Sequence, residues 1–401
     1  MDRAKNPFSP GAGTPPPELA GRATILDNAL VALERVKNGR AEKSMILVGL
    51  RGVGKTVLLG EAQRLAEKAG YRVAFIEAHE SRQKKTLAEL LIPHLRRILF
   101  DLDRGEKISD KAKKALRVFK SFMSALKLKT GDLEFYLDMD AEKGEADSGD
   151  LEVDLAALFV AIGEAAKDRH TAVAIIIDEL QYVEETEVSA LIMAIHRVSQ
   201  RSLPLILIGA GLPQLRAKAG NSKSYAERLF AYPEVGALNK QDAIAALQRP
   251  VQELSVSFSD EALNEIYDTT KGYPYFVQEW GYHAWNTAQQ SPIGRNDITE
   301  ASKLSIANLD KSFFRTRFDR LTPSEKKYVR ALAELGSTPQ RSGDIAAKLG
   351  KTVEQVAALR AQLISKGMIY SPAHGDTAFT VPLFEEFLMR EIPVFSAKEQ
   401  Y

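Results

Sequence analysis

The stretch Gly49-Leu50-Arg51-Gly52-Val53-Gly54-Lys55-Thr56 decides the fold. It follows an apolar run, Ser44 to Val48, that predicts a buried strand, and it opens a helical pattern from Thr56 to Ala69. Glycines between a strand and a helix let consecutive backbone N–H groups curl around a phosphate at the helix N-terminus. The sequence therefore predicts a phosphate-binding loop.

Each residue type in this loop suits one part of a nucleoside triphosphate and its metal. Lys55 can reach the β- and γ-phosphates, and the Thr56 hydroxyl can bind Mg²⁺. The alternative, a glycine turn with a solvated lysine, is disfavoured by the strand–loop–helix context. We expect ATP and Mg²⁺ as cofactors, with nucleotide contacts from Gly49, Gly52, Val53, Gly54, Lys55, Thr56 and Val57.

A second apolar strand, Ala172 to Asp178, ends in the acidic pair Asp178-Glu179. A buried strand delivers such a carboxylate to the carboxyl edge of a sheet, where Asp178 can hold Mg²⁺ through water. Glu179 is placed to orient and polarise an attacking water. A strand ending in Asp-Glu is as often structural when it stands alone, but the upstream phosphate loop favours a catalytic pair.

Strand and helix patterns alternate from Ser44 to Leu238, which predicts an α/β core with a parallel sheet covered on both faces. The expected strands are Ser44–Val48, Tyr71–Glu77, Ala172–Asp178, Pro204–Gly209 and Pro233–Leu238. The expected helices are Ala23–Asn38, Thr56–Ala69, Lys85–Leu99, Leu151–Lys167, Val188–Gln200 and Pro213–Phe230. A basic helix and an alternating hairpin pattern over residues 101–150 predict an insertion with a β-hairpin.

The patterns divide the chain into four parts. Residues 1–22 are rich in Pro and Gly and predict an extended, loosely held segment, and residues 23–238 predict the ATPase-type core. Residues 239–310 predict a helical lid with N-caps at Asn239 and Ser259. Residues 311–401 read as three helices and a hairpin, a winged-helix pattern, with capping boxes at Thr322 and Thr352. The second box opens a helix whose expected buried face carries Val353, Val356, Leu359 and Leu363.

Composition limits the classes of function. Among 401 residues, 45% are apolar, 27% are charged and the net charge is +1, as in an ordinary globular protein. The chain has no cysteine, and its six histidines lack metal-ligand spacing. No apolar run approaches the roughly 18 residues of a membrane span. We therefore expect no membrane partner and, by default, a cytoplasmic location.

Two further polar positions have competing interpretations. Gln214, after the expected strand ending at Gly209, is a candidate γ-phosphate sensor, but a plain glycine turn is equally compatible. Arg228 ends a predicted helix just before the last short strand, where an arginine could neutralise phosphate charge in the transition state. A salt bridge to its neighbour or a solvated helix end is the alternative for Arg228.

Taken in order, these residues resemble an ATPase of the AAA+ and STAND branch of P-loop proteins, similar to bacterial and archaeal ATPases resembling origin-recognition initiators. The resemblance implies an adenine site near Gly21 and Arg22, an arginine finger at Arg228 acting on a neighbouring subunit, and a proline contact from Pro274. Many AAA+ members have an arginine directly after the Gly-x-Pro turn of the lid, which here is Gly272-Tyr273-Pro274, whereas this chain has Tyr275 at that position. That departure implies slow turnover.

The predicted winged helix leaves the partner open. From Lys311 to Glu391 there are 13 Lys/Arg and 9 Asp/Glu, a modest basic excess. Because phosphate contacts dominate affinity, such a face predicts weak, salt-sensitive binding to double-stranded DNA. The leading hypothesis is an ATPase whose nucleotide positions the lid and winged helix on DNA, with self-association or a partner protein. The alternative is a STAND-like switch or scaffold that binds ATP or ADP and contacts only proteins.

Overall fold

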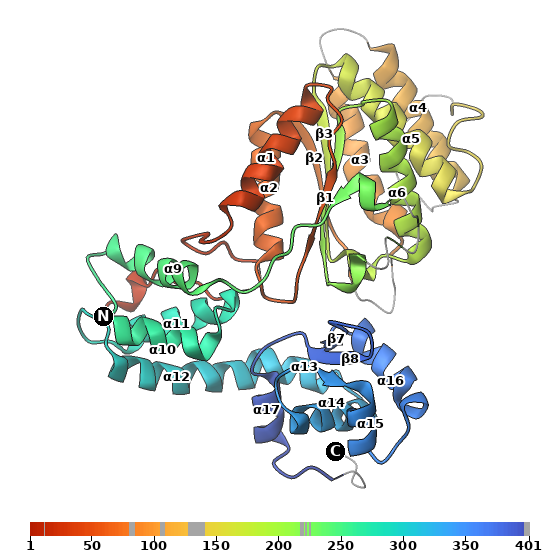
Figure 1. The fold of residues 1–401 in the computed structure, drawn as a ribbon. Helices are drawn as coiled ribbons and strands as arrows, with labels where there is room; N and C mark the ends of the chain where they lie inside the picture. The colour runs from red at the N-terminus through yellow and green to blue at the C-terminus, as the bar shows by residue number, and fades with distance from the viewer. Residues whose placement is uncertain are drawn as a thin grey trace. The chain divides into compact units, whose positions relative to one another are not determined.

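The computed structural model describes residues 1–11, 13–79, 85–104, 109–126, 141–216, 220, 223 and 226–396 (Figure 1). The chain divides into two compact units. The core unit comprises Arg22–Gly49 and Lys55–Val235. The C-terminal unit comprises Met1–Gly21, Leu50–Gly54 and Gly236–Tyr401, so it includes five residues of the phosphate loop.

A five-stranded parallel sheet forms the centre of the core unit. Its strands are β1 (Ser44–Val48), β2 (Tyr71–Glu77), β3 (Ala172–Asp178), β4 (Leu205–Gly211) and β5 (Phe230–Ala231). Their spatial order is β2-β3-β4-β1-β5, and all pairings are parallel. Strands β1, β3 and β4 are buried along their whole length, as expected for a sheet covered on both faces. The predicted α/β fold is confirmed.

Helices cover both faces of this sheet. In Figure 1, α1 and α2 lie on one side, and α3, α4, α5 and α6 lie on the other. Their bounds are α1 Ala23–Lys37, α2 Lys55–Lys68, α3 Leu87–Asp103, α4 Asp110–Ala125, α5 Leu151–Asp168 and α6 Glu185–Gln200. Helix α4 belongs to the predicted insertion, yet its Phe119 and Phe122 are fully buried in the same apolar core as α5. The expected hairpin of the insertion lies outside the described residues.

The end of the core unit differs from the sequence prediction in two places. The expected strand Pro233–Leu238 is wrong, because the last strand pairs through Phe230–Ala231 and only an isolated bridge joins Val48 to Glu234. The expected helix Pro213–Phe230 is not continuous, since Lys223 is not helical and only α8, Ala226–Leu229, follows it. Gly220, a weak helix former, lies just before this interruption.

The predicted lid contains four helices of the C-terminal unit: α9 (Lys240–Gln252), α10 (Asp260–Thr270), α11 (Pro274–Thr287) and α12 (Arg295–Leu309). The first two begin where predicted, because the Asn239 side chain accepts a hydrogen bond from the Asp242 N–H and Ser259 accepts one from Ala262. Helix α12 lies beyond the last helix expected for this region. None of the described helices is both long and apolar enough to cross a membrane.

The N-terminal segment is not loosely held. The Trp285 indole Nε1 donates to the Asp2 carbonyl at 2.8 Å. The Phe8 ring is 2% exposed, packs edge-on against Phe258, and approaches Gly281 so closely that a Cβ there would lie 2.8 Å from the ring. These contacts join the segment to residues far along the chain, so its Pro and Gly content alone could not reveal them.

The remainder of the C-terminal unit has the helix and hairpin order expected of a winged helix. It begins with a π-helical turn, η4 (Asp310–Phe314), and α13 (Arg315–Asp319). Then follow α14 (Pro323–Leu335), β6 (Gln340–Arg341), α15 (Ser342–Lys348), α16 (Val353–Ser365), β7 (Ile369–Tyr370), β8 (Asp376–Phe379) and α17 (Phe384–Glu391). Strand β6, which the sequence did not suggest, completes an antiparallel sheet in the order β6-β8-β7.

The capping boxes at Thr322 and Thr352 are present and set the starts of α14 and α16. The expected burial of α16 is correct for Val356 and Leu363, Leu359 is half-buried, and the expectation is wrong for Val353, which is exposed. Val353 is the first residue of its helix, where the chain has not yet turned its apolar face inward.

Candidate functional site

The core of the candidate site joins the first turn of α2 to the carboxyl end of β3. The Thr56 Oγ1 hydroxyl donates to Asp178 Oδ2 at 2.6 Å. The other carboxylate oxygen of Asp178 accepts the backbone N–H of Glu179 at 2.8 Å. These two oxygen-bearing side chains, 122 positions apart in the sequence, therefore meet as predicted for a magnesium site.

Asp178 is 2% exposed, and its charge is poorly compensated. Burial raises the pKa of Asp178, although the Thr56 and Glu179 hydrogen bonds and the Lys55 ammonium oppose that rise. A divalent cation on this carboxylate would favour its charged form. The hard oxygen donors present therefore fit Mg²⁺, with Thr56 and Asp178 as the residues that would hold it.

Lys55 is placed on the loop side of the same site. It is 6% exposed, and its Nζ donates to the Gly49 carbonyl at 3.0 Å. The Gly49 N–H in turn donates to the Gly211 carbonyl at 3.2 Å, which ties the start of the loop to the end of β4. A buried ammonium that donates to a loop carbonyl is well placed to exchange that contact for a phosphate oxygen.

Glu179 has a backbone conformation that few non-glycine residues adopt. Its φ and ψ are 55° and 37°, in the left-handed region, which costs about 1–2 kcal/mol for an ordinary L-residue. Gln181 Nε2 donates to the Glu179 carboxylate, and the Leu212 N–H donates to Gln181 Oε1 at 3.1 Å. Strain held in place by such contacts is typical of functional positions.

Gln181 is a polar residue of this site that the sequence prediction missed. It links Glu179 to the turn that follows β4, where the sequence predicted a candidate γ-phosphate sensor. The predicted candidate, Gln214, forms no such link: its Oε1 is buried and has no hydrogen-bond partner among the described residues. The signal for Gln181 was its position two residues after Glu179, in the 3-10 turn η3 (Leu180–Tyr182).

Residues 50–54 of the loop pack within the C-terminal unit. Gly52 and Gly54 have φ of +78° and +94°, so both positions need glycine. The Gly52 carbonyl accepts the Tyr275 N–H at 3.3 Å, and Pro274 is the first residue of α11, a position that favours proline. Val53 is 2% exposed. Val57, in the core unit, is half-buried.

Of the other predicted contacts, Gly21 belongs to the C-terminal unit, and Arg22 and Arg228 belong to the core unit. Gly21 has φ +68°, and a Cβ there would lie 2.5 Å from Asp242 Oδ2, so a side chain is not accommodated. Arg22 is the N-cap of α1 and is 9% exposed. Arg228 is exposed and makes no ion pair within the described part of the chain, so the alternative of a neighbour salt bridge is wrong for it.

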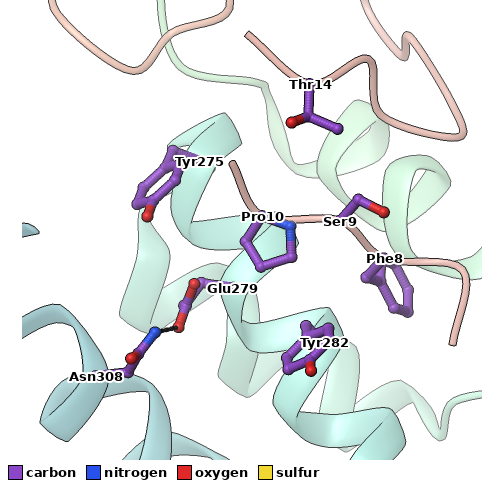
Figure 2. A pocket seen from close by; sticks show the side chains of 8 residues that line it. All are labelled: Phe8, Ser9, Pro10, Thr14, Tyr275, Glu279, Tyr282 and Asn308. Atoms are coloured by element: carbon purple, nitrogen blue, oxygen red, sulfur yellow. Dashed lines mark hydrogen bonds between the residues drawn. The ribbon is translucent and has the colours of Figure 1, made fainter. Parts of the chain in front are cut away.

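A separate hollow of about 370 Å³ lies within the C-terminal unit, between the N-terminal segment and helices α11 and α12 (Figure 2). Glu279 lines it, is 1% exposed, and accepts from Asn308 Nδ2 at 2.6 Å. The same Oε1 lies 3.1 Å from His283 Nε2. None of the residues that line this hollow is a predicted nucleotide contact.

The fold and the meeting of Lys55, Thr56 and Asp178 define a P-loop ATPase core. The family model described as "AAA ATPase domain" matches residues 18–208, which confirms the expected AAA+ ATPase class for this core. A second family model, a domain of unknown function (DUF8462), matches residues 311–388. No curated protein matched the sequence.

Solved structures agree with this fold. The Walker-type ATPase PABY2304 of Pyrococcus abyssi aligns over 95% of this chain and 99% of its own, at 16% identity and a TM-score of 0.60. Cdc6p from Pyrobaculum aerophilum aligns over 98% of both chains at 13% identity and 0.45. The RuvB Holliday junction branch migration motor of Thermotoga maritima covers 93% of this chain and 95% of its own, at 14% and 0.43. The last two TM-scores lie below 0.5, so the fold assignment rests on the first structure and the family match.

Proposed function

We propose that this AAA+ ATPase holds Mg-ATP through Lys55, Thr56 and Asp178 and hydrolyses it slowly. The observation that carries the proposal is the 2.6 Å contact between Thr56 Oγ1 and Asp178 Oδ2, beside the buried Lys55. Magnesium, when bound, would neutralise charge on the phosphate oxygens. The residues of this chain would supply its oxygen ligands and the lysine contact to the phosphates.

Glu179 acts as the base that orients the attacking water in this proposal. Glu179 directly follows Asp178, and its strained backbone and the hydrogen bond from Gln181 fix the position of its carboxylate. Gln181 restricts the Glu179 rotamer and connects it to the turn after β4. A proton taken from water would then reside on the Glu179 carboxylate.

Slow turnover is expected because an isolated subunit brings few arginine side chains to the phosphates. The turn at Pro274 is followed by Tyr275 and not by an arginine. Arg228 is exposed and is available to a neighbouring subunit, where it would complete the site in trans. An isolated subunit would lack that arginine and hydrolyse ATP slowly. Gly21, Arg22 and Pro274 are the proposed contacts to the adenine and ribose.

The bound nucleotide is proposed to set the position of the lid and the winged helix. Support comes from residues 50–54, which belong to the C-terminal unit by their packing while Lys55 and Thr56 belong to the core unit. A change in nucleotide state at the loop would therefore act on both units. The proposed output is weak, salt-dependent binding of double-stranded DNA through the winged helix.

A protein-directed switch is the second candidate, and one observation favours it. Several basic side chains of the winged helix are engaged within the unit: Arg315 bonds Glu391 at 2.5 Å, Lys366 bonds Glu325 at 2.7 Å, and Arg330 is fully buried. Cations already paired with carboxylates contribute little to phosphate binding. Retention of ADP through purification, with slow exchange, would support this second function.

The hydrolysis role is tested with Glu179→Gln. The expected result is a fall in kcat of about 10²- to 10⁴-fold with Mg-ATP affinity retained, because a general base acts on the chemical step. Exposed Glu185, at the start of α6, gives the matched control Glu185→Gln. Parent-like turnover by Glu179→Gln would exclude Glu179 as the base.

A further inference from the structure

The hollow beside the N-terminal segment lies wholly within the C-terminal unit (Figure 2). Helix α11 lines it with Tyr275, Glu279 and Tyr282, which share one face because they are spaced four and three residues apart. Asn308 of α12 and four residues of the N-terminal segment complete the lining: Phe8, Ser9, Pro10 and Thr14. Its volume of about 370 Å³ is within the usual range of small-ligand sites, so it has room for a small molecule or one long side chain.

One oxygen of the buried Glu279 carboxylate has no donor among the described residues. Glu279 is 1% exposed. Its Oε1 accepts from Asn308 Nδ2 at 2.6 Å and lies 3.1 Å from His283 Nε2, whereas no described residue donates a hydrogen bond to Oε2. Within the described ranges, the imidazole of His283, charged only when protonated, is the sole ion-pair partner of this carboxylate. Because a buried carboxylate is costly unless its oxygens are paired, Oε2 lacks a donor that a ligand could supply.

The rest of the lining suits a cation better than an anion. It carries no lysine or arginine, so an anion would meet only the like charge of Glu279. The rings of Phe8, Tyr275 and Tyr282 add aromatic surface, whose faces attract cations. Tyr282 is 36% exposed, so its ring is accessible to a ligand. Burial, reinforced by Glu279 and opposed by Arg317, raises the pKa of Tyr275, so its hydroxyl stays neutral.

The number of available oxygens decides which kind of cation fits. Magnesium and calcium take about six or more oxygen ligands, and no group of three or more His, Asp or Glu side chains in the described part of the chain could hold a metal. A guanidinium pairs best with both oxygens of a carboxylate, and Glu279 Oε1 is already engaged by Asn308. A quaternary ammonium has no N–H for Oε2. An alkylammonium is a compact charge with N–H donors, and it needs only one oxygen.

We propose that the hollow binds an alkylammonium group, with Glu279 Oε2 as its hydrogen-bond acceptor and counter-charge. The rings of Tyr275 and Tyr282 would contact its aliphatic chain. Two sources carry this group, a free polyamine and a lysine side chain of another protein, and the same contacts recognise both. Because Phe8 and Pro10 also line the hollow, the ligand would hold the N-terminal segment on α11. This site is independent of the proposed nucleotide site.

The test is a calorimetric titration of the nucleotide-free full chain with n-butylammonium. We expect the parent to bind it and Glu279→Gln to bind about 10- to 100-fold more weakly, because glutamine keeps an acceptor for Asn308 and loses the charge. Tyr282→Leu, at an exposed position, should bind about 2- to 10-fold more weakly through loss of the ring. The control Glu253→Gln removes an exposed carboxylate at the end of α9 and should match the parent.

Deuterium exchange gives a second readout at the N-terminal segment. Saturating n-butylammonium should slow exchange of the backbone amides of Phe8, Ser9 and Gly11 in the parent, and should not slow it in Glu279→Gln. No binding of n-butylammonium by the parent would overturn the proposal. So would equal binding by the parent, Glu279→Gln and Tyr282→Leu.

Further probes separate the two sources and test the role of Oε2. Tighter binding of spermidine than of Nα-acetyl-lysine methylamide assigns a free polyamine, and the reverse order assigns a protein side chain. Either result supports the proposal only if Glu279→Gln loses that binding. Tetramethylammonium, which has no N–H, should bind more weakly than n-butylammonium, and equal binding would contradict the hydrogen bond to Oε2.

Discussion

Burial raises the pKa of Asp178, so we expect its charged form to cost stability at neutral pH in the nucleotide-free protein, a cost that a bound cation would remove. Its carboxylate is buried, and its hydrogen bonds from Thr56 and Glu179 only partly oppose the desolvation. A carboxylate that is already charged before the metal arrives binds the metal more tightly. The cost in stability and the proposed function therefore have the same origin.

The pH dependence of stability tests this balance. Because the folded-state pKa of Asp178 is raised above its ordinary 3.8, the folded protein binds the proton more tightly than the unfolded chain. Its contribution to stability is full below pH 3.8 and is lost as pH rises through the folded pKa. Asp178→Asn removes that loss. We expect its free energy of unfolding, relative to the parent, to increase as pH rises from about 4.

Urea unfolding without metal or nucleotide measures this difference, with the exposed Asp268→Asn as the control. A difference between Asp178→Asn and the parent that stays constant from pH 4 to pH 8 would contradict the assigned cause.

At the residue scale, the sequence predicted the groups that lie on a regular motif and missed those placed by tertiary contacts. Lys55, Thr56 and Asp178 follow from strand, loop and helix order. Gln181 does not, because its contacts depend on the turn after β4.

At the scale of elements, local capping chemistry proved more informative than periodicity. Asn239, Ser259, Thr322 and Thr352 each mark a helix start in the structure. The expected helix Pro213–Phe230 is not continuous, because the chain is not helical at Lys223. Short strands such as β5 and β6, of two residues each, carry too little pattern to be predicted.

The N-terminal segment provides a prediction at this scale. Phe8 is the buried anchor of that segment, so Phe8→Ala should remove about 3–5 kcal/mol of local packing. We expect backbone amides of residues 1–11 to exchange with deuterium much faster in this variant. The neighbouring Ser9 is exposed, so Ser9→Ala should exchange like the parent. Unchanged exchange in Phe8→Ala would show that two hydrogen bonds suffice to hold the segment, from Trp285 Nε1 to the Asp2 carbonyl and from Asn6 Nδ2 to the Tyr282 carbonyl.

At the scale of the whole molecule, more of the basic side chains are paired within the protein than the sequence suggested. The basic excess over Lys311–Glu391 includes arginines that pair within the C-terminal unit, among them Arg315 with Glu391 and Arg390 with Asp310. Arg360 donates to Thr377 and to the Asp376 carbonyl, so this side chain on α16 is also engaged. Counting charges along the sequence could not reveal these pairings, because the partners lie up to 80 positions apart.

Duplex DNA binding should therefore be weak and governed by few phosphate contacts. We expect a Kd no tighter than about 10⁻⁶ M at physiological salt, with a shallow dependence on salt concentration. A fluorescence anisotropy titration over several salt concentrations, repeated with ADP and with a non-hydrolysable ATP analogue, measures both quantities. Nanomolar, sequence-specific binding would contradict the view that the basic residues are engaged internally.

The central claim is that the loop and the Thr56–Asp178 pair together hold Mg-ATP. The most direct measurement is a calorimetric titration of the parent and of Lys55→Ala with ATP, with and without magnesium. The account predicts binding by the parent that strengthens with magnesium, and a loss of about 10- to 100-fold or more in Lys55→Ala. Equal heats from both proteins, or no dependence on magnesium, would contradict it.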